Sequence, residues 1–361
     1  MKILVFNWRD IKNPEAGGAE RYTHEIFKRI AKGNEVTLFT SEFPGCKKEE
    51  SLEGIRIVRK GGKYSLYLKA KEYYKKYFSK EGFDVVIDEI NTIPFFAPKF
   101  VRGEKVICLI HQLAREFWFY ETSFPISWIG YYWLENKWLK NYIDIPTITV
   151  SESTKMDLLS LGFKKVFIVH NGANVKPLKK PPKKAEKPTI IFVGRMKRAK
   201  KPQDVLEAFK IVRRRMSDVR LWMVGDGYLR RKLEKISTGE VRFFGYLDEK
   251  KKIELMKKAW VIVVPGVREG WGQVVTDANA LATPAIAYDV PGLRDSLKDN
   301  YNGMLVENNP KALAQTIIKV LEDEKLRSKL SKNALEWARK FDWDRSAKEF
   351  EKIIKMVIKK K

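Results

Sequence analysis

Short apolar runs alternate with longer amphipathic segments along almost the whole chain. The runs are rich in Val and Ile and recur in both halves, at residues 2–6, 36–40, 55–58, 85–88, 106–110, 189–193, 220–224, 241–245, 261–264 and 285–288. Between them, apolar residues recur at helical spacing, as in 18–31 and 202–215. Such runs predict buried strands, and the intervening helices predict parallel crossover connections. The chain is therefore expected to be an α/β protein built from doubly wound parallel sheets.

A Pro- and Lys-rich stretch, residues 176–188, interrupts this alternation. It reads K-P-L-K-K-P-P-K-K-A-E-K-P, a composition typical of a linker, and the alternation restarts beyond it. We predict two Rossmann-like domains facing each other across a cleft, at residues 1–175 and 189–340. The last segment, 341–361, is predicted to be an amphipathic helix and is a candidate to cross back to the first domain.

The most informative stretch runs from residue 261 to residue 289. An apolar run is cut by Pro265 and Gly266, passes the loop E-G-W-G at 269–272, and continues into an Ala-rich helical segment and a second apolar run. A loop at the carboxyl end of a strand that opens a helix favours a phosphate. Glu269 and Asp277 are separated by about two helical turns, so both could reach one bound ligand.

Two further strand ends carry candidate ligand-binding residues. G-G-A-E at 17–20 opens a helix, and adjacent glycines let the backbone approach a ligand, although paired glycines before a helix more often form only a turn. His111 ends the run 106–110, and a structural hydrogen bond is its alternative role. The dinucleotide fingerprint G-x-G-x-x-G is absent and the second run ends in Thr40 and Ser41, so a dehydrogenase is disfavoured.

Basic residues follow the first apolar run of the second half. In G-R-M-K-R-A-K-K at 194–201, Arg195 and Lys200 could place a guanidinium fork and an ammonium on one diphosphate. Solvation is the alternative role in a chain with 71 basic and 45 acidic residues and a net charge of +26. That charge indicates anionic partners: nucleotide phosphates, nucleic acid or an anionic membrane.

Composition bears on the compartment. Cys46 and Cys108 lack metal-ligand spacing, which fits a reducing cytoplasm, and abundant Lys with few Gln suggests a thermophile. No signal peptide is expected, because a strand pattern begins at residue 2, and the longest uncharged run, 122–134, is shorter than the roughly 20 residues of a membrane span. We therefore expect a cytoplasmic protein that does not cross a membrane.

Residues 117–138 are unusually aromatic, with Trp118, Trp128, Trp133 and Trp138 among them. The segment is interpreted either as a buried helical excursion or as a surface that meets lipid headgroups, where Trp and Tyr are enriched. The Lys-rich segment 64–80 would supply positive charge for peripheral binding to an anionic membrane.

Several motifs, taken in order, resemble one family. They are G-G-A-E-R at 17–21, His111, V-S-E-S-T-K at 150–155, H-N-G-A-N at 170–174, F-V-G-R-M at 192–196, G-D-G at 225–227, F-F-G-Y-L at 243–247, the stretch 261–289, P-G-L-R-D at 291–295 and N-G-M-L-V at 302–306. This ordered set is similar to the retaining GT-B glycosyltransferases of family four, the glycosyl transferases group 1. The resemblance spans nearly the whole chain.

The resemblance implies a nucleotide-sugar donor bound mainly by the second domain and an acceptor bound mainly by the first. It assigns the donor diphosphate to Arg195 and Lys200 and the donor sugar to Glu269. Asp277 stands where the family has a second Glu that binds the ribose, and its carboxylate is one methylene shorter. The other implied donor-binding residues are Gly17, Gly18, Gly194, Trp271, Gly272 and Gln273, with His111 near the sugar.

The implied reaction is sugar transfer to an acceptor hydroxyl with retention of configuration. Arg195, Lys200 and the helix N-terminus would stabilise the charge that develops on the leaving phosphate, so no metal or other cofactor is expected. The acceptor is expected to be a lipid-linked or cell-envelope glycan precursor at the inner membrane face. A sugar-nucleotide 2-epimerase and a non-catalytic basic protein that binds membrane or nucleic acid are the alternatives; for the transferase no nucleic-acid partner is expected.

Overall fold

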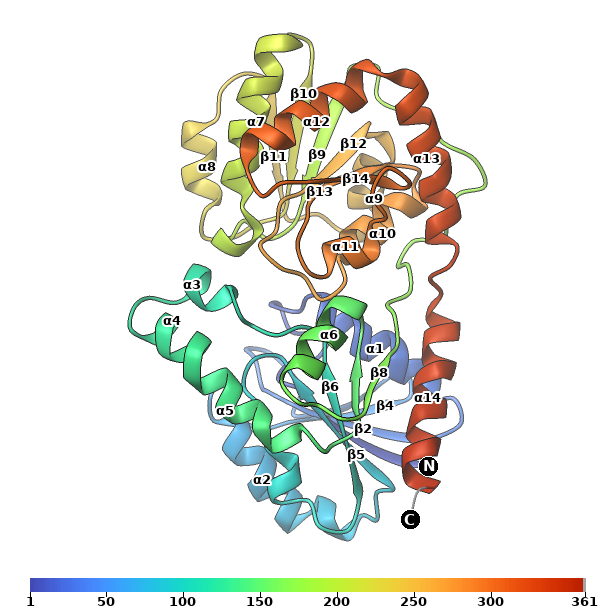
Figure 1. Cartoon of the computed structure of the whole chain (residues 1–361). Coiled ribbons are helices and arrows are strands. Elements are labelled where there is room, and N and C mark those ends of the chain that lie inside the picture. Colours follow the sequence, from blue (N-terminus) through green and yellow to red (C-terminus); the bar gives the residue numbers. More distant parts are fainter. Residues whose placement is uncertain (360–361) are drawn as a thin grey trace. The chain divides into compact units, whose positions relative to one another are not determined.

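The computed structural model describes residues 1–359, which form two compact α/β units (Figure 1). Unit 1 contains residues 1–115, 128–172 and the segment from 342 onward; unit 2 contains residues 116–127 and 173–341. The predicted fold class, two doubly wound parallel-sheet domains, is confirmed. Within residues 1–359, no helix combines the length and apolar content that crossing a membrane requires.

Unit 1 is built on an eight-stranded sheet with the order β3-β4-β2-β1-β5-β6-β7-β8. All neighbours are parallel except β3 and β4. The strands are β1 (Lys2–Phe6), β2 (Glu35–Thr40), β3 (Glu49–Leu52), β4 (Ile55–Arg59), β5 (Val85–Ile90), β6 (Lys105–Ile110), β7 (Thr147–Thr149) and β8 (Val166–Ile168). The chain proceeds outward from β1 to β2 and β4, then returns to the other side of β1 as β5. The topological switch point therefore lies between β1 and β5, where the loops diverge.

Helices cover this sheet and link its strands. They are α1 (Gly18–Ile30), α2 (Leu66–Lys76), α4 (Ile126–Ile129), α5 (Glu135–Leu139), α6 (Glu152–Ser160) and α14 (Trp343–Lys359), with short 3₁₀ turns at Phe78–Lys80, Ala97–Lys99 and Lys140–Tyr142 and one π-helical turn, Gly130–Leu134. By the division above, the first residues of α4 fall in unit 2.

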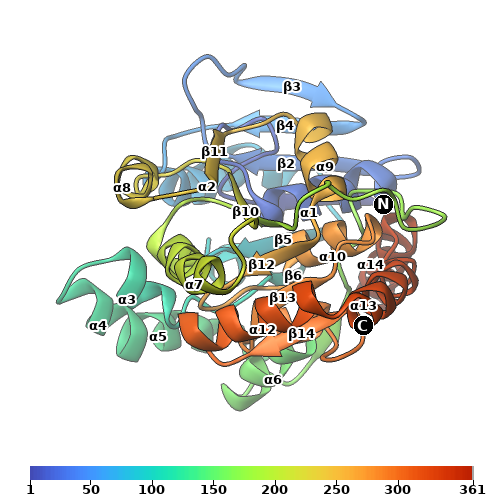
Figure 2. The ribbon, with the colours of Figure 1, turned by 90° about the horizontal axis from the view of Figure 1, so that it is seen from above.

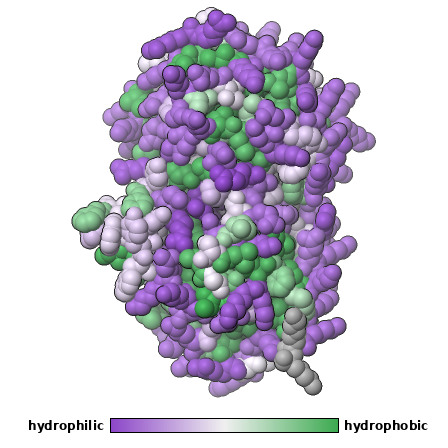
Figure 3. Space-filling view, in the orientation of Figure 1, coloured by the Kyte–Doolittle hydropathy of each residue, from purple (hydrophilic) through white to green (hydrophobic). Residues whose placement is uncertain are grey.

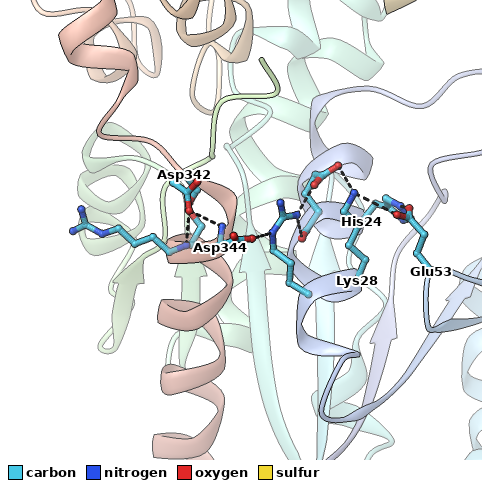
Figure 4. A network of polar contacts seen from close by, with 9 residues as sticks. His24, Lys28, Glu53, Asp342 and Asp344 are labelled. Atoms are coloured by element: carbon cyan, nitrogen blue, oxygen red, sulfur yellow. Dashed lines mark hydrogen bonds and ion pairs between the residues drawn. The ribbon is translucent and has the colours of Figure 1, made fainter. Parts of the chain in front are cut away.

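The chain's last helix, α14, packs along α1. The Phe350 ring lies 5.4 Å from that of Phe27, and Trp343 packs edge-on against Tyr22. The buried positions of α14 recur every three or four residues, as an amphipathic helix requires. Polar contacts flank this seam: Figure 4 shows Asp344, at the start of α14, beside α1, where it pairs with Arg29. The C-terminal helix thus completes unit 1.

Unit 2 has a six-stranded parallel sheet with the order β11-β10-β9-β12-β13-β14. Its strands are β9 (Thr189–Val193), β10 (Arg220–Val224), β11 (Val241–Gly245), β12 (Val261–Val264), β13 (Ala285–Tyr288) and β14 (Gly303–Val306). The chain again proceeds outward, from β9 to β11, and returns on the other side of β9 as β12. The switch point of unit 2 therefore lies between β9 and β12.

The helices of unit 2 are α3 (Phe117–Glu121), α7 (Pro202–Arg215), α8 (Arg230–Ile236), α9 (Glu249–Lys258), α10 (Gln273–Ala280), α11 (Leu293–Ser296), α12 (Pro310–Glu322) and α13 (Glu324–Ala338), with a 3₁₀ turn at Arg198–Lys200. Figures 1 and 2 both show α7 beside α12. The Pro- and Lys-rich residues lie against this unit, since the Ala185 N–H donates to the Lys258 carbonyl. Sheet and helices enclose one continuous apolar core.

Gly172 lies where the start of α14 meets the chain that leaves β8. A Cβ at this position would lie 2.5 Å from both Trp343 N and Trp343 Cγ, far inside van der Waals contact. We expect Gly172→Ala to destabilise the protein by about 1–3 kcal/mol, because the extra methyl forces α14 outward. The measurement is equilibrium unfolding in urea. Gly33→Ala is the control, since a Cβ there meets nothing within 4 Å, and an equal loss in both variants would contradict the packing argument.

Asp88, fully buried on β5, organises the segment after its strand. Its carboxylate accepts hydrogen bonds from Ala97 N (2.9 Å), Phe95 N (3.2 Å) and the Tyr142 hydroxyl (2.5 Å). Burial nevertheless raises the Asp88 pKa from 3.8 to about 6, because desolvation of the charge outweighs these bonds.

This pKa predicts a pH-dependent stability. A carboxyl whose pKa is higher in the folded state stabilises that state when protonated, and the contribution disappears as pH rises through about 6. We expect Asp88→Asn to be more destabilising relative to wild type at pH 4.5 than at pH 6.5, because only the wild type loses this contribution over that range. Urea unfolding at both values measures the difference. Asp218→Asn, at an exposed aspartate, should show no such dependence; a constant Asp88→Asn effect would refute the assignment.

Candidate functional site

The switch point of unit 2 brings together two loops that the sequence singled out. One follows β9 and contains Gly194 to Lys201; the other follows β12 and contains Pro265 to Gly272. The two loops are in direct contact: the Val267 N–H donates to the Ala199 carbonyl at 3.0 Å. The Lys200 ammonium also pairs with the Glu269 carboxylate. The structure therefore brings together two residues, 69 positions apart in the sequence, that were predicted to act on one ligand.

The Lys200–Glu269 pair is partly accessible. The side chains are 29% and 18% exposed, so a ligand can reach both without unfolding the loops. An ion pair at this level of exposure contributes about 1 kcal/mol or less. A phosphate on Lys200 and sugar hydroxyls on Glu269 could therefore replace it at small cost. The structure places Arg195 in the same loop, five residues before Lys200, where it is partly buried.

Neighbouring turns hold both loops by close backbone contact. A Cβ at Gly225 would lie 2.0 Å from the Gly194 carbonyl oxygen, and one at Gly292 would lie 1.9 Å from that of Glu269. Both glycines also have positive φ, of 123° and 81°. This explains physically why G-D-G at 225–227 and P-G-L-R-D at 291–295 accompany the two site loops.

The loop after β12 leads directly into α10. Gly272 precedes the helix in the left-handed region, with φ of 78°, and Gln273 begins it. Trp271 is buried: its indole N–H donates to Thr276 Oγ1 at 2.9 Å, and its ring packs edge-on against Phe341. The Trp271 side chain therefore anchors the loop from inside unit 2.

Asp277 is buried on α10, with protein donors on both of its oxygens. Oδ1 accepts from Asn174 N at 2.8 Å and from Gln273 Nε2 at 3.1 Å, and Oδ2 accepts from Asn174 Nδ2 at 3.0 Å. Burial raises the pKa of Asp277, and the bonds from Asn174 and Gln273 act against this rise. In this arrangement Asp277 ties α10 to the H-N-G-A-N turn. Its sequence-based role as a ribose ligand stays a prediction.

In unit 1, His111 directly follows β6, and Glu89 and Tyr22 hold its ring in place. Its Nε2 lies 3.0 Å from Glu89 Oε1, and its ring lies 5.0 Å from that of Tyr22. Glu89 is buried at the end of β5 and also accepts from Thr23 Oγ1 at 2.5 Å; burial raises its pKa. Glu89 was not among the site residues predicted from the sequence. The available signal was an acid within the apolar run V-V-I-D-E-I, which ends at the switch point.

The paired glycines open α1 as predicted from the pattern. Gly17 precedes the helix, and its N–H donates to the Glu20 carboxylate at 2.6 Å, while the same carboxylate accepts from Trp8 Nε1 at 2.8 Å. A Cβ at Gly18 would meet nothing within 4 Å, so the space beside it is open. Within residues 1–359, no group of three His, Cys, Asp or Glu side chains is placed to hold a metal ion.

Comparison with known proteins gives two consecutive family matches. Residues 16–176 match the model described as Glycosyltransferase Family 4, and residues 176–337 match Glycosyl transferases group 1. The chain is 30% identical over 203 residues to an uncharacterized glycosyltransferase of Methanocaldococcus jannaschii, covering 55% of this chain and 56% of that protein. It is 31% identical over 224 residues to a phosphatidyl-myo-inositol mannosyltransferase of Mycobacterium leprae, covering 59% of each.

These alignments span little more than half the length of the two relatives. Over the whole chain, the fold is similar to that of sucrose-phosphate synthase from Thermosynechococcus elongatus, with a TM-score of 0.81, 20% identity, and coverage of 99% of this chain and 98% of that structure. Two adjoining family matches and this shared fold agree with the motif order. The chain belongs to the family 4, group 1 glycosyltransferases, and its two units have the GT-B fold.

Proposed function

We propose that the protein is a retaining hexosyltransferase that moves a sugar from a nucleoside-diphosphate donor to an acceptor hydroxyl. The observation that carries the proposal is the partly accessible Lys200–Glu269 pair at the switch point of unit 2. One cation suited to phosphate and one carboxylate suited to sugar hydroxyls meet where ligands bind open α/β sheets. A donor would separate the pair and give each member a new partner.

The charges of this loop suit cleavage of the bond between the anomeric carbon and the diphosphate. As that bond breaks, negative charge grows on the β-phosphate, and Lys200 and Arg195 stabilise it. The acceptor oxygen forms the new bond on the same face, and the departing phosphate oxygen takes the acceptor's proton. This route uses no side-chain nucleophile, and we propose that it needs no metal ion. Glu269 orients the sugar by accepting hydrogen bonds from its hydroxyls.

For the remaining residues we retain the roles implied by family membership. Gly194, Gly272 and Gln273 line the donor loops of unit 2, and Asp277 is the proposed ribose ligand. In unit 1, Gly17 and Gly18 are proposed to contact the donor and His111 to lie near its sugar. Glu89 holds the His111 ring in its orientation.

A lipid-linked or cell-envelope glycan at an anionic membrane face is the proposed acceptor. Side chains around α4 and the turn that follows it form an exposed ridge of four aromatic residues and two isoleucines: Phe124, Ile126, Trp128, Ile129, Tyr132 and Trp133. Figure 3 shows less polar side chains gathered on the projection where Figure 1 labels α4. Trp128 and Trp133 are 55% and 54% exposed, which supports the headgroup interpretation of this segment. The sequence match to a phosphatidyl-myo-inositol mannosyltransferase points the same way.

A groove beside the ridge adds positive charge to it. Its volume is about 450 Å³, and Tyr132, Trp133, Lys137 and Lys140 are among its lining residues. The Lys137 ammonium lies 4.2 Å from the Trp133 ring centroid. Aromatic surface beside ammonium groups is the combination that binds anionic headgroups.

Nucleotide binding tests the proposed activity first. With EDTA present, one nucleoside diphosphate among UDP, GDP and ADP should raise the thermal unfolding midpoint, because it binds only the folded protein. Lys200→Ala should remove most of that shift. Glu269→Gln should keep nucleotide binding but reduce transfer from the matching nucleotide-sugar at least about 100-fold, since its partner is the sugar.

Lys250→Ala, at an exposed lysine of α9, is the control for a lost positive charge and should behave like wild type. Wild-type transfer by folded Lys200→Ala or Glu269→Gln would disprove the site assignment. No shift with any nucleotide would favour the non-catalytic alternative, and interconversion of sugar-nucleotides without an acceptor would favour the epimerase.

Membrane binding is tested by flotation with liposomes that contain anionic lipid. The double variant Trp128→Ser/Trp133→Ser should float less than wild type, because it removes apolar surface that would enter the headgroup layer. Tyr246→Ser is the matched control, since Tyr246 is a highly exposed aromatic residue of unit 2. Unchanged flotation of the folded double variant would argue against this surface as the contact.

A further inference from the structure

One short helix of unit 2, α3, carries acidic side chains onto the loops of the candidate donor site. Glu121 Oε1 accepts a hydrogen bond from Ala199 N at 3.0 Å, and Glu121 Oε2 accepts one from the Tyr228 hydroxyl at 3.2 Å. The same hydroxyl accepts from Arg198 N at 2.9 Å. Two consecutive backbone amides between Arg195 and Lys200 are thus occupied, one of them directly by a carboxylate.

A second acidic contact fixes the other end of α3. Glu116 Oε2 lies 2.6 Å from Arg268 Nε, and Glu116 Oε1 lies 3.4 Å from Arg268 Nη2. Arg268 is buried in the loop after β12, two residues from Gly270 and next to Glu269 in the sequence. The helix therefore attaches to both loops of the switch point, the one after β9 through Glu121 and the one after β12 through Glu116.

We propose that α3 is an acidic strap that competes with the donor's diphosphate for the loop after β9. The inference rests on the proposed function, because it takes that loop as the diphosphate site. A carboxylate on a backbone N–H makes the bond that a phosphate oxygen would make there. A bound diphosphate beside Lys200 and Arg195 would also repel the Glu121 charge. Donor binding is then accompanied by release of α3.

This competition lowers the apparent donor affinity. A protein whose binding-competent form is only fractionally populated binds its ligand more weakly by that fraction, so a strap closed in about 90% of molecules weakens binding about tenfold. Removing the Glu121 charge should shift the balance toward the open form. A strap that instead shaped the donor site would have the opposite effect, and its loss would weaken binding.

The test combines affinity and hydrogen exchange in the full chain. Isothermal titration gives Kd for the nucleoside diphosphate with the largest thermal shift, and for pyrophosphate as a base-free probe. We expect Glu121→Gln to lower both Kd values by about three- to tenfold. Amide exchange in residues 114–124 should rise when nucleotide saturates the wild type and should already be high in nucleotide-free Glu121→Gln. Glu254→Gln makes the same charge change at an exposed glutamate of α9 and should match wild type.

The outcomes separate the strap from the function it rests on. Nucleotide binding with unchanged exchange at 114–124, or a Glu121→Gln Kd equal to or higher than that of wild type, overturns the strap. If neither nucleotide nor pyrophosphate binds, the proposed function fails; raised exchange in Glu121→Gln would then still show that Glu121 holds α3 down, whereas unchanged exchange would overturn that as well.

Discussion

The reversal of strand order beside β9 determines where the candidate site lies in unit 2. Strands β10 and β11 lie on one side of β9, and strands β12, β13 and β14 lie on the other. The loops that follow β9 and β12 are therefore adjacent, and the chain leaves them in opposite directions. Lys200 and Glu269 meet only because of this topology. The backbone at Gly225 packs directly against Gly194, and that at Gly292 packs against Glu269. These close contacts hold the two loops in place. The position of the candidate site in this unit therefore follows from strand order.

The sequence was sufficient to predict the repeating elements and that Lys200 and Glu269 lie close together, whereas the ligand-binding roles of these residues stay predictions. Buried strands such as β12 and β13 are continuous apolar runs, and their lengths distinguish them from helices. The edge strand β3, E-E-S-L, has alternating partial exposure and no apolar run, so it carried no such signal. The hydrophobic pattern also could not predict contacts between segments that are far apart in the sequence. Nothing in the spacing of Asp277 indicates that Asn174 supplies two of its hydrogen bonds.

Acidic residues illustrate the same limit more sharply. Glu89, Glu116, Glu121 and Asp277 look alike in sequence, yet one supports a histidine, two hold a helix on basic loops and one links a turn to a helix. Their roles depend on which donors tertiary folding brings within about 3 Å, and periodicity contains no such information. Glu269 and Asp277 were singled out because one lies in a loop that follows a strand and the other in the helix that this loop opens. Glu89, Glu116 and Glu121 lack that local context.

Unit 1 is built from segments that are far apart in the sequence, and this affects how the chain folds during synthesis. Its first two segments end at Arg115 and Gly172, but α14, which packs against Tyr22 and Phe27, follows unit 2 in the sequence. At about 5–20 residues per second, a ribosome needs about 10–40 s to extend the chain from Gly172 to the end of α14. Most of unit 2 is synthesised during that interval. The nascent chain therefore contains an unfinished apolar surface on α1 while unit 2 folds, and unit 1 becomes complete only once α14 has been synthesised.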